Sequence, residues 1–291
     1  MKLILHAGAH FTEEGRLMKC LLRNADHLSA QGVMVPGPGR YRELLRKTFN
    51  AMRDGTLLPL AREELEEAIF DKRQTGRVVL SNANLFGVPR AAIHEGYFYP
   101  KAAERMEHLR ELFPDVEMEL YFALRNPASF LSHLHEFLRE HAGVAAYEHM
   151  DPRGLRWSIL LKQIRDAAPD VPITVWCAED APLIWGELVR DMSGLDPSHR
   201  VTGAFDLLAE IMTQEGYSRF ETYITSRREL SDQQVRRVIA AFLDKFALED
   251  AVEEELSMPG WSEALVQSAT EVYDEDVAYI GQLPGIDLIL P

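Results

Sequence analysis

The sequence predicts one α/β domain built on a parallel sheet, and three observations support this fold class. Short apolar runs alternate with longer segments of helical spacing throughout the first 180 residues. The first 36 residues read as strand, loop, helix and strand, which is the unit from which parallel sheets are built. Strand patterns almost vanish after residue 180. We therefore expect a single domain over residues 1–291, with a parallel α/β core in 1–180 and a mainly helical cap in 181–291.

The first elements are predicted as follows. Residues 2–8 form a buried strand, because a short apolar run there is closed by a glycine. Apolar residues fall at helical spacing over residues 13–31, with Thr12 in the N-cap position and two glutamates in the first turn. A glycine ends this helix, and residues 33–36 predict a second short strand.

The later elements follow from the same patterns. Helices are expected at residues 41–52, 61–70, 99–113, 128–141 and 153–168, with almost continuous helix from 183 to 280. Further strands are expected at residues 77–81, 116–124 and 173–177, and a short apolar run over 286–290 closes the chain. The prediction is a parallel sheet of four or five strands flanked by helices, in which the helices at 41–52 and 61–70 pack together.

Composition narrows the classes of partner. The chain has 291 residues, 46% hydrophobic and 26% charged, which is enough to bury a sizeable core. Its formal net charge of −15 argues against nucleic acid or an anionic membrane as a partner, since both are bound by basic surfaces. No apolar stretch approaches the roughly 18 to 20 residues of a membrane span, and no secretory signal is recognisable. We expect a soluble, cytoplasmic protein with a small-molecule or nucleotide ligand.

The sequence predicts neither a disulfide framework nor a metal site. The two cysteines lie in separate helix and strand patterns and are expected to be reduced. His133 and His135 are two residues apart on a predicted helix and so point in different directions. The pair Glu179-Asp180 follows a strand, where it could bind a cation or a substrate amine or cap a helix. The run Glu253-Glu254-Glu255 is interpreted as a solvated face.

Three loops are candidates for the ligand site, because ligands of parallel sheets bind beyond the carboxyl ends of the strands. They cover residues 8–12, 81–84 and 125–132. The first loop leads into a helix N-terminus, where free N–H groups and the helix dipole favour an anion. Many α/β proteins carry such a loop without a ligand, and the complete signature with Gly-Lys-Ser/Thr is absent here.

Two stretches of the chain resemble bacterial sulfotransferase-like proteins of the P-loop class. The resemblance covers roughly the first 40 residues and residues 120–135. It is carried by Leu3-Ile4-Leu5-His6-Ala7-Gly8-Ala9-His10 with Thr12, by Leu21-Leu22-Arg23-Asn24, and by Arg125-Asn126-Pro127 with Ser132. It implies a P-loop sulfotransferase-like fold and transfer of a sulfuryl group from 3′-phosphoadenylyl sulfate (PAPS) to a hydroxyl of a small-molecule, lipid or sugar acceptor.

The resemblance also implies roles for individual residues. In that family a His-Lys-Thr-Gly-Thr-Thr loop binds the 5′-phosphosulfate, and a strand-end arginine with a helix serine binds the 3′-phosphate. Carried over, His10 and Thr12 match the loop that binds the phosphosulfate, and Arg125 with Ser132 would bind the 3′-phosphate of PAPS or of its product, adenosine 3′,5′-bisphosphate (PAP). Arg16 matches no position of the family motif but is close enough in sequence to help bind the phosphosulfate. His10 is the candidate catalytic base.

The first loop departs from the family pattern at the positions that bear charge. Phe11 stands in place of the lysine, which in the family neutralises charge on the leaving phosphate, and Glu13-Glu14-Gly15 replaces Gly-Thr-Thr. Each carboxylate would repel a nearby phosphate by roughly 1 kcal/mol or more. Both glutamates also suit the N-terminus of an unliganded helix. Compensating cations would come from Arg16 and Lys19 one turn further on, or from Arg40 and Arg42 in the neighbouring loop.

The other candidate residues have two interpretations each. The side chains of Asn82, Asn84, Arg40 and Arg42 could hydrogen-bond a substrate. The asparagine amides cannot act as the catalytic base. His10 is either that base or a neutral histidine bonded at the sheet edge. Arg125 either grips a phosphate or pairs with a carboxylate.

Three functions are therefore compatible with the sequence. The first is sulfuryl transfer from PAPS, and the second is a catalytically inactive sulfotransferase-like protein that binds a nucleotide, a small molecule or a protein. The third is a transferase that uses a less anionic donor, since the loop has an aromatic ring in place of a cation.

Overall fold

The structure is a computed structural model and describes residues 1–56, 59–70, 76–143, 147–227, 229–252, 254, 256 and 258–291. Its main sheet has six strands in the order β2-β3-β1-β6-β7-β8, and each pairing is parallel. The strands are β1 (Lys2–His6), β2 (Val33–Met34), β3 (Arg77–Ser81), β6 (Glu117–Leu124), β7 (Ile173–Cys177) and β8 (Ile286–Ile289). The predicted α/β class with a parallel sheet flanked by helices is confirmed.

The central strand, β1, lies beside the point where the direction of the chain reverses. Leu5 of β1 is paired with Leu80 of β3 on one side and with Leu120 of β6 on the other. After β1 the chain continues to β2 and β3, whereas after β6 it continues to β7 and β8 at the opposite edge. Neighbouring strands whose connections leave in opposite directions open a crevice at their carboxyl ends. The loops after β1 and β6 meet at this crevice.

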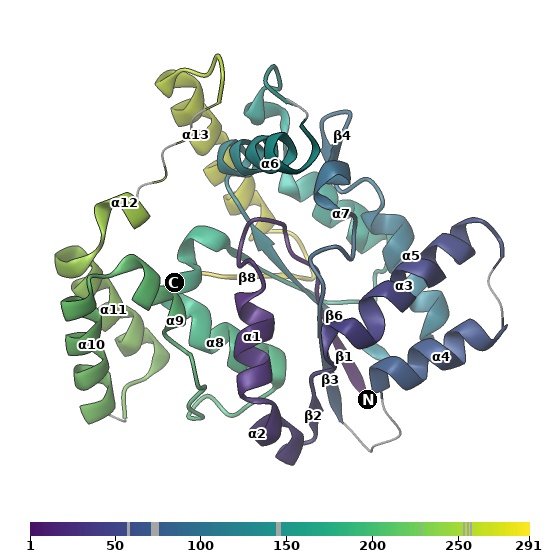
Figure 1. The fold of residues 1–291 in the computed structure, drawn as a ribbon, viewed down its shortest axis with the longest axis horizontal. Coiled ribbons are helices and arrows are strands. Elements are labelled where there is room, and N and C mark those ends of the chain that lie inside the picture. The colour runs from purple at the N-terminus through teal and green to yellow at the C-terminus, as the bar shows by residue number, and fades with distance from the viewer. Residues whose placement is uncertain are drawn as a thin grey trace.

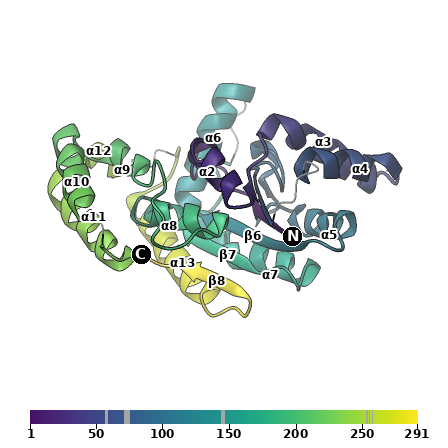
Figure 2. The ribbon, with the colours of Figure 1, turned by 90° about the horizontal axis from the view of Figure 1, so that it is seen from below.

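Both faces of the sheet are buried because helices cover each of them. Successive side chains of each strand point to opposite faces, so each strand contributes to both cores. On one face Leu5 and Leu120 belong to a core that includes side chains from α3 (Pro38–Arg53), α4 (Pro59–Phe70), α5 (Ala102–Leu112), α6 (Pro127–Ala142), α7 (Trp157–Ala167) and α13 (Glu263–Ile280). On the other face Ile4 and Trp176 pack with α1 (Arg16–Arg23), α2 (Ala25–Ala30) and α8 (Ala181–Ser193). Figures 1 and 2 show these two layers of helices around the sheet.

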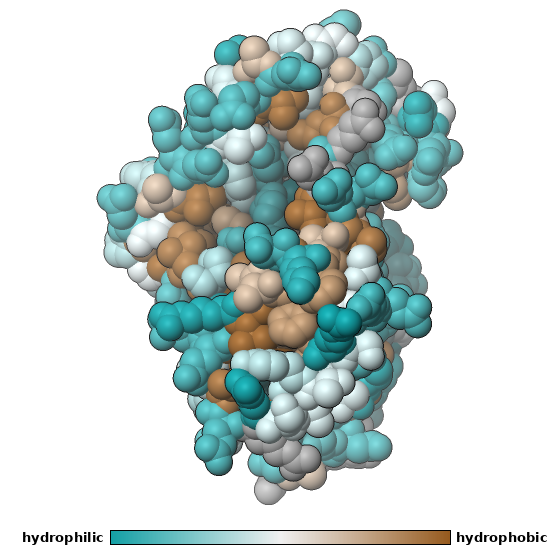
Figure 3. Space-filling view, turned by 90° about the vertical axis from the view of Figure 1, so that its left-hand side faces the viewer, coloured by the Kyte–Doolittle hydropathy of each residue, from teal (hydrophilic) through white to brown (hydrophobic). Residues whose placement is uncertain are grey.

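The remaining helices form a separate layer beside α8. They are α9 (Asp206–Ile211), α10 (Gln214–Ser226), α11 (Asp232–Phe246) and α12 (Glu249–Val252). Phe220 and Ile239 are the centre of a third apolar cluster that holds α9, α10 and α11 together. On the side of the molecule where α10 and α11 lie, hydrophobic side chains reach the surface in patches between hydrophilic ones (Figure 3). None of the described helices combines the length and apolar character needed to cross a membrane.

Two helix predictions are wrong in detail. The helix expected over 13–31 begins at Arg16 and divides into α1 and α2 at Asn24. It begins late because Glu14 and Gly15 have positive φ angles of 49° and 80°, which turn the chain before the helix. The helix expected from residue 99 begins at Ala102, because a short hairpin of β4 (Ile93–His94) and β5 (Tyr97–Phe98) precedes it.

The sheet has one strand more than the four or five expected. The additional strand is β8, which pairs with β7 through Ile286 opposite Ile173 and Leu288 opposite Val175. The helix α13 packs against α6 and α7 and brings the end of the chain back to the sheet edge. Helices α3 and α4 pack together as predicted. The single domain over residues 1–291, with its core and cap, stays a prediction.

Candidate functional site

The loop after β1 follows β6 before it turns away. The N–H groups of Ala7 and Ala9 donate to the carbonyl oxygens of Tyr121 and Ala123, both at 3.1 Å. The chain then turns at Phe11, whose φ is 61°. Among the described residues, no hydrogen bond uses the backbone N–H groups of residues 11–15. The backbone N–H groups of residues 11–15 are therefore free, within the described part of the chain, to bind a ligand at the crevice between β1 and β6.

His10 lies buried at the start of this turn. Its backbone N–H donates to the Tyr99 hydroxyl at 3.0 Å, and its Nδ1 lies 2.7 Å from the same oxygen. Its Nε2 lies 3.0 Å from Oδ1 of Asn84. Because an amide oxygen accepts only, Nε2 carries the proton, and Nδ1 accepts from Tyr99. Burial lowers the pKa of His10, although the bond to Asn84 opposes this. His10 is held as a neutral histidine with both ring nitrogens engaged.

Thr12 and Arg16, which the sequence predicted to bind the phosphosulfate, bond to groups of the protein itself. The Thr12 hydroxyl donates to the Ala9 carbonyl at 2.8 Å, which closes the turn. Arg16 donates to both oxygens of Glu210 at 2.9 and 2.7 Å and to Glu14 at 3.0 Å. Neither residue has a described contact with Arg125. Thr12 is also not the N-cap that the pattern predicted, because Gly15 holds that position.

The helix-cap interpretation of the acidic pair is confirmed for Glu13. Glu13 is 8% exposed, and its carboxylate accepts the N–H of Leu17 at 2.8 Å, inside the first turn of α1. A carboxylate at this place stabilises a helix through its unpaired N–H groups and its dipole. The same carboxylate adds negative charge beside the loop.

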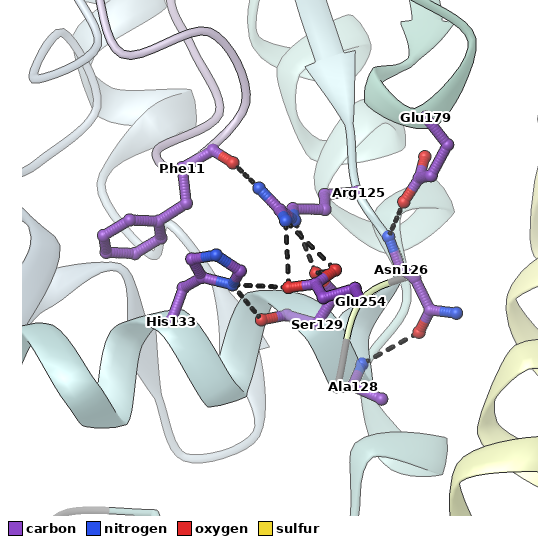
Figure 4. A network of polar contacts seen from close by, with 8 residues as sticks. All are labelled: Phe11, Arg125, Asn126, Ala128, Ser129, His133, Glu179 and Glu254. Carbon is purple, nitrogen blue, oxygen red and sulfur yellow. Dashed lines mark hydrogen bonds and ion pairs between the residues drawn. The ribbon is translucent and has the colours of Figure 1, made fainter. Parts of the chain in front are cut away.

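Arg125 connects the loop after β6 to the loop after β1 (Figure 4). Its Nη1 donates to the carbonyl oxygen of Phe11, so the two loops lie together as the strand order requires. Its Nε donates to the Ser129 hydroxyl at 2.5 Å. The backbone around it is fixed by Asn126, whose side chain caps α6 at Ala128. Trp157 adds a bond from Nε1 to the Arg125 carbonyl at 2.7 Å.

The Arg125 cluster, which we define as Arg125, Ser129 and His133, holds the carboxylate of Glu254. Arg125 Nη2 lies 3.1 Å from both Glu254 oxygens, and the Ser129 hydroxyl donates to one of them at 2.6 Å. His133 Nδ1 lies 3.0 Å from the other oxygen. Figure 4 shows the carboxylate between the guanidinium and the imidazole. Three donors of different kinds therefore converge on one anionic group.

The geometry of the cluster shifts the pKa values of Glu254 and His133 in opposite directions. Burial alone would raise the pKa of Glu254, but hydrogen bonds from His133 and Ser129 and the charge of Arg125 lower the pKa to about 2. The bond to Glu254 in turn raises the pKa of His133, against the effects of burial and of the Arg125 charge. The cluster thus favours a negative charge at this position.

The sequence located part of this cluster. Arg125 was predicted to bind an anion or to pair with a carboxylate, and here it pairs with Glu254. The serine beside it is Ser129, one helical turn on, whereas Ser132 has no hydrogen bond to any described residue. Glu253 and Glu255 lie outside the described residues, but Glu254 is not simply solvated. No sequence signal joins Glu254 to a residue 129 positions earlier.

The predicted substrate residues at the end of β3 line a cavity of about 260 Å³. Arg42, Asn82 and Asn84 lie in its wall together with Arg46 and Arg105, whereas Arg40 does not line it. We call this space the β3 cavity. Arg42 is fixed by a bond from Nε to the Ser81 carbonyl at 3.1 Å. Because Asn84 also bonds His10, the cavity reaches the loop after β1.

Glu179 connects two loops, and His133 and His135 of α6 point in different directions. Glu179 accepts the N–H of Asn126 at 2.8 Å and the Tyr273 hydroxyl at 3.2 Å, so it ties the β7 loop to the β6 loop. His135 is buried while His133 faces Glu254, so the two histidines do diverge. Over the described part of the chain, no three His, Cys, Asp or Glu side chains are placed to share a metal ion.

Comparison of the chain with known protein families, with curated proteins and with solved structures gives no match. The resemblance to sulfotransferases therefore depends on the two motif regions alone, and the site has to be interpreted from its own geometry.

Proposed function

We propose that this chain binds a phosphate-bearing small molecule at the carboxyl edge of its sheet, with a phosphate in the Arg125 cluster. The observation that carries the proposal is that this cluster already binds one anionic group, the Glu254 carboxylate, through three converging donors. A guanidinium paired with a hydroxyl suits a phosphate as well as it suits a carboxylate. PAPS and its product PAP are the ligands that the sequence resemblance suggests.

The site offers an incomplete fit to PAPS itself. A single phosphate would find its donors in the Arg125 cluster, but residues 8–12 of the first loop supply no cationic side chain of their own for the phosphosulfate. Phe11 replaces the expected lysine, and Arg16 is paired with Glu14 and Glu210. The carboxylate of Glu13 lies at the same turn. These contacts favour the second hypothesis of the sequence, a protein that binds a nucleotide or related anion without transferring a sulfuryl group.

Sulfuryl transfer is the second candidate function, and one observation favours it. The β3 cavity lies beside His10, since both share Asn84, and it would hold a small acceptor at the edge of the first loop. A base must remove the acceptor proton during transfer. His10 would first have to release Tyr99 from Nδ1. Transfer also requires a cation at the leaving phosphate, and Phe11 stands where the resemblance would place the lysine that supplies it.

Calorimetric titration with PAP tests the proposal. We expect micromolar binding to the wild-type chain or to a variant that lacks the Glu254 carboxylate, and loss of that binding in Arg125→Ala. Arg139→Ala is the matched control, because Arg139 lies near the end of α6, the helix that follows Arg125, with its side chain 63% exposed, and its loss should leave affinity unchanged. Equal affinities of the two arginine variants, or no heat with any form at millimolar PAP, would refute the proposal.

Turnover is measured separately. PAP release from PAPS in the presence of phenolic and sugar hydroxyls distinguishes transfer from binding alone. We expect no release by the wild-type chain. Release by the wild-type chain that is abolished in His10→Ala would establish the second candidate instead. A gain of turnover in Phe11→Lys alone would support loss of the cation as the reason for inactivity.

A further inference from the structure

A second cavity lies between α8 and the helices α10 and α11. Its volume is about 360 Å³, within the range of about 300–1,000 Å³ that is common for small-molecule sites. Its walls are formed by α8, by the loop at residues 197–205, by the end of α10 and by α11. We call it the cap cavity. It shares no described lining residue with the Arg125 cluster or with the β3 cavity.

The inner wall of the cap cavity is apolar. Trp185 and Ile239, which are 2% and 1% exposed, lie on opposite helices, and Leu183, Ile224 and Val235 complete the wall. Trp185 belongs to the cluster under the sheet, and Ile239 belongs to the cluster of the cap. The cavity thus lies where two separately packed layers meet, and such junctions are a common place for ligand sites. Hydrophobic surface is visible on this side of the molecule in Figure 3.

Two ion pairs keep the walls together. Arg190 of α8 pairs with Asp232 of α11, and Arg236 of α11 pairs with Glu187 of α8 at 2.6 Å. The four partners lie in the cavity wall, so their charges are balanced by each other. The side chain of Arg190 is 12% exposed, and the pairing compensates for its burial. These pairs fix the distance between α8 and α11 and leave the apolar wall between them open.

The remaining charges of the wall are predominantly positive. Arg200 and Arg227 are exposed and line the cavity, and neither forms an ion pair with another described residue. The Arg227 guanidinium lies over the Tyr223 ring, 4.2 Å from its centroid, and this contact orients it. Glu229 is the one further carboxylate of the described lining. In a chain with a net charge of −15, two guanidiniums that form no ion pair with a described residue make a local positive site at this apolar cavity.

We infer that the cap cavity binds an amphipathic carboxylate, with its apolar body between Trp185 and Ile239 and its anionic head at Arg200 and Arg227. Charge complementarity selects this ligand class. An amphipathic cation would place its charge beside two guanidiniums, and a neutral apolar molecule would give them no ionic partner. The site is independent of the proposed phosphate site, so either can exist without the other.

Calorimetry with decanoate, below its micelle-forming concentration, tests this inference, and decylammonium serves as the probe of opposite charge. We expect decanoate to bind at least tenfold more tightly than decylammonium. The double variant Arg200→Ala with Arg227→Ala should weaken decanoate binding at least tenfold, and both side chains are exposed, so the fold should be kept. Absence of decanoate binding, or equal binding of the two probes, would overturn the inference.

A second pair of variants tests where the apolar body lies. Val235→Trp on α11 should fill the cavity and abolish decanoate binding, because Val235 is half-buried in its wall. Gln233→Trp lies exposed on the same helix outside the lining and is the matched control. Decanoate binding that is equal in these two variants, or unchanged in the double arginine variant, would place the ligand elsewhere and overturn the inference.

Discussion

Removal of the Glu254 carboxylate should strengthen binding of phosphate compounds to the Arg125 cluster. Glu254 occupies the donors of Arg125, Ser129 and His133 that a phosphate would use. A ligand must therefore displace this carboxylate before it binds. The apparent affinity is therefore the intrinsic affinity multiplied by the fraction of molecules in which the cluster is free. In Glu254→Ala the cluster is always free, and one repelling charge is also removed.

The structure sets the size of this effect. Two unit charges at the 3.1 Å separation of Arg125 and Glu254 would attract by roughly 5 kcal/mol at an effective dielectric constant of about 20. The side chain of Glu254 is 38% exposed, so solvent screening reduces this strongly. We take about 1–2 kcal/mol for the whole contact, including the bonds from Ser129 and His133. Since about 1.4 kcal/mol corresponds to tenfold in affinity, PAP should bind about 5- to 30-fold more tightly.

Isothermal titration calorimetry with PAP measures this change directly. Glu249→Ala is the control, because it removes the same charge from an exposed position on the neighbouring helix α12. Only the Glu254 variant should gain affinity, and the gain should disappear when Arg125→Ala is added. Equal gains in both glutamate variants would show a general charge effect. Unchanged affinity in Glu254→Ala would refute the argument that this carboxylate competes with the ligand.

Three further predictions concern stability. The Glu254 pKa lies below 4.5 and the His133 pKa above 6.5, so their contact stabilises the fold fully between those values. This contribution to stability is lost as the pH falls towards about 2, where Glu254 is protonated, or rises through the raised pKa of His133, where the imidazole becomes neutral. The measurement is the difference in Tm between wild type and Glu254→Gln as a function of pH, and a difference that does not change with pH would contradict this prediction. Asp276→Ala should lower the free energy of unfolding, measured in urea, by about 2–4 kcal/mol, because the buried carboxylate accepts both the N–H and the hydroxyl of Ser158 at the start of α7. A decrease of less than about 1 kcal/mol would refute this role. Trp157→Phe should lower the free energy of unfolding by about 1–3 kcal/mol, because the ring stack on Phe98 is kept while the hydrogen bond to the Arg125 carbonyl is lost. Trp157→Ala should lower it further, because the ring stack is lost as well, and equal decreases in the two variants would contradict this prediction.

The strands were the most predictable part of the fold. Parallel strands are buried on both faces and read as short apolar runs, so β1, β6 and β7 were recognised at or near their observed bounds. The edge strand β8 was missed because a run of four residues, of which one is buried, resembles an ordinary chain end. The hairpin of β4 and β5 was missed because each strand has two residues, although Glu95-Gly96 at its turn is a recognisable signal.

The candidate site was predictable only where it depends on strand order. The rule that ligands bind beyond the carboxyl ends of strands placed Arg125 beside the loop after β1, and the bond to Phe11 agrees with that expectation. The sequence pointed to Ser132, but Arg125 bonds Ser129, because the exact direction of α6 decides which serine faces the arginine and periodicity does not give that direction. Glu254 comes from a distant segment, and long-range contacts of this kind leave no local pattern in the sequence.

A crystal structure of the chain with PAP most directly tests whether the Arg125 cluster is a phosphate site. The account predicts a phosphate within hydrogen-bond distance of the Arg125 guanidinium and the Ser129 hydroxyl, with the Glu254 carboxylate displaced from both. A nucleotide bound elsewhere while Glu254 keeps its contacts with Arg125, Ser129 and His133 would contradict it.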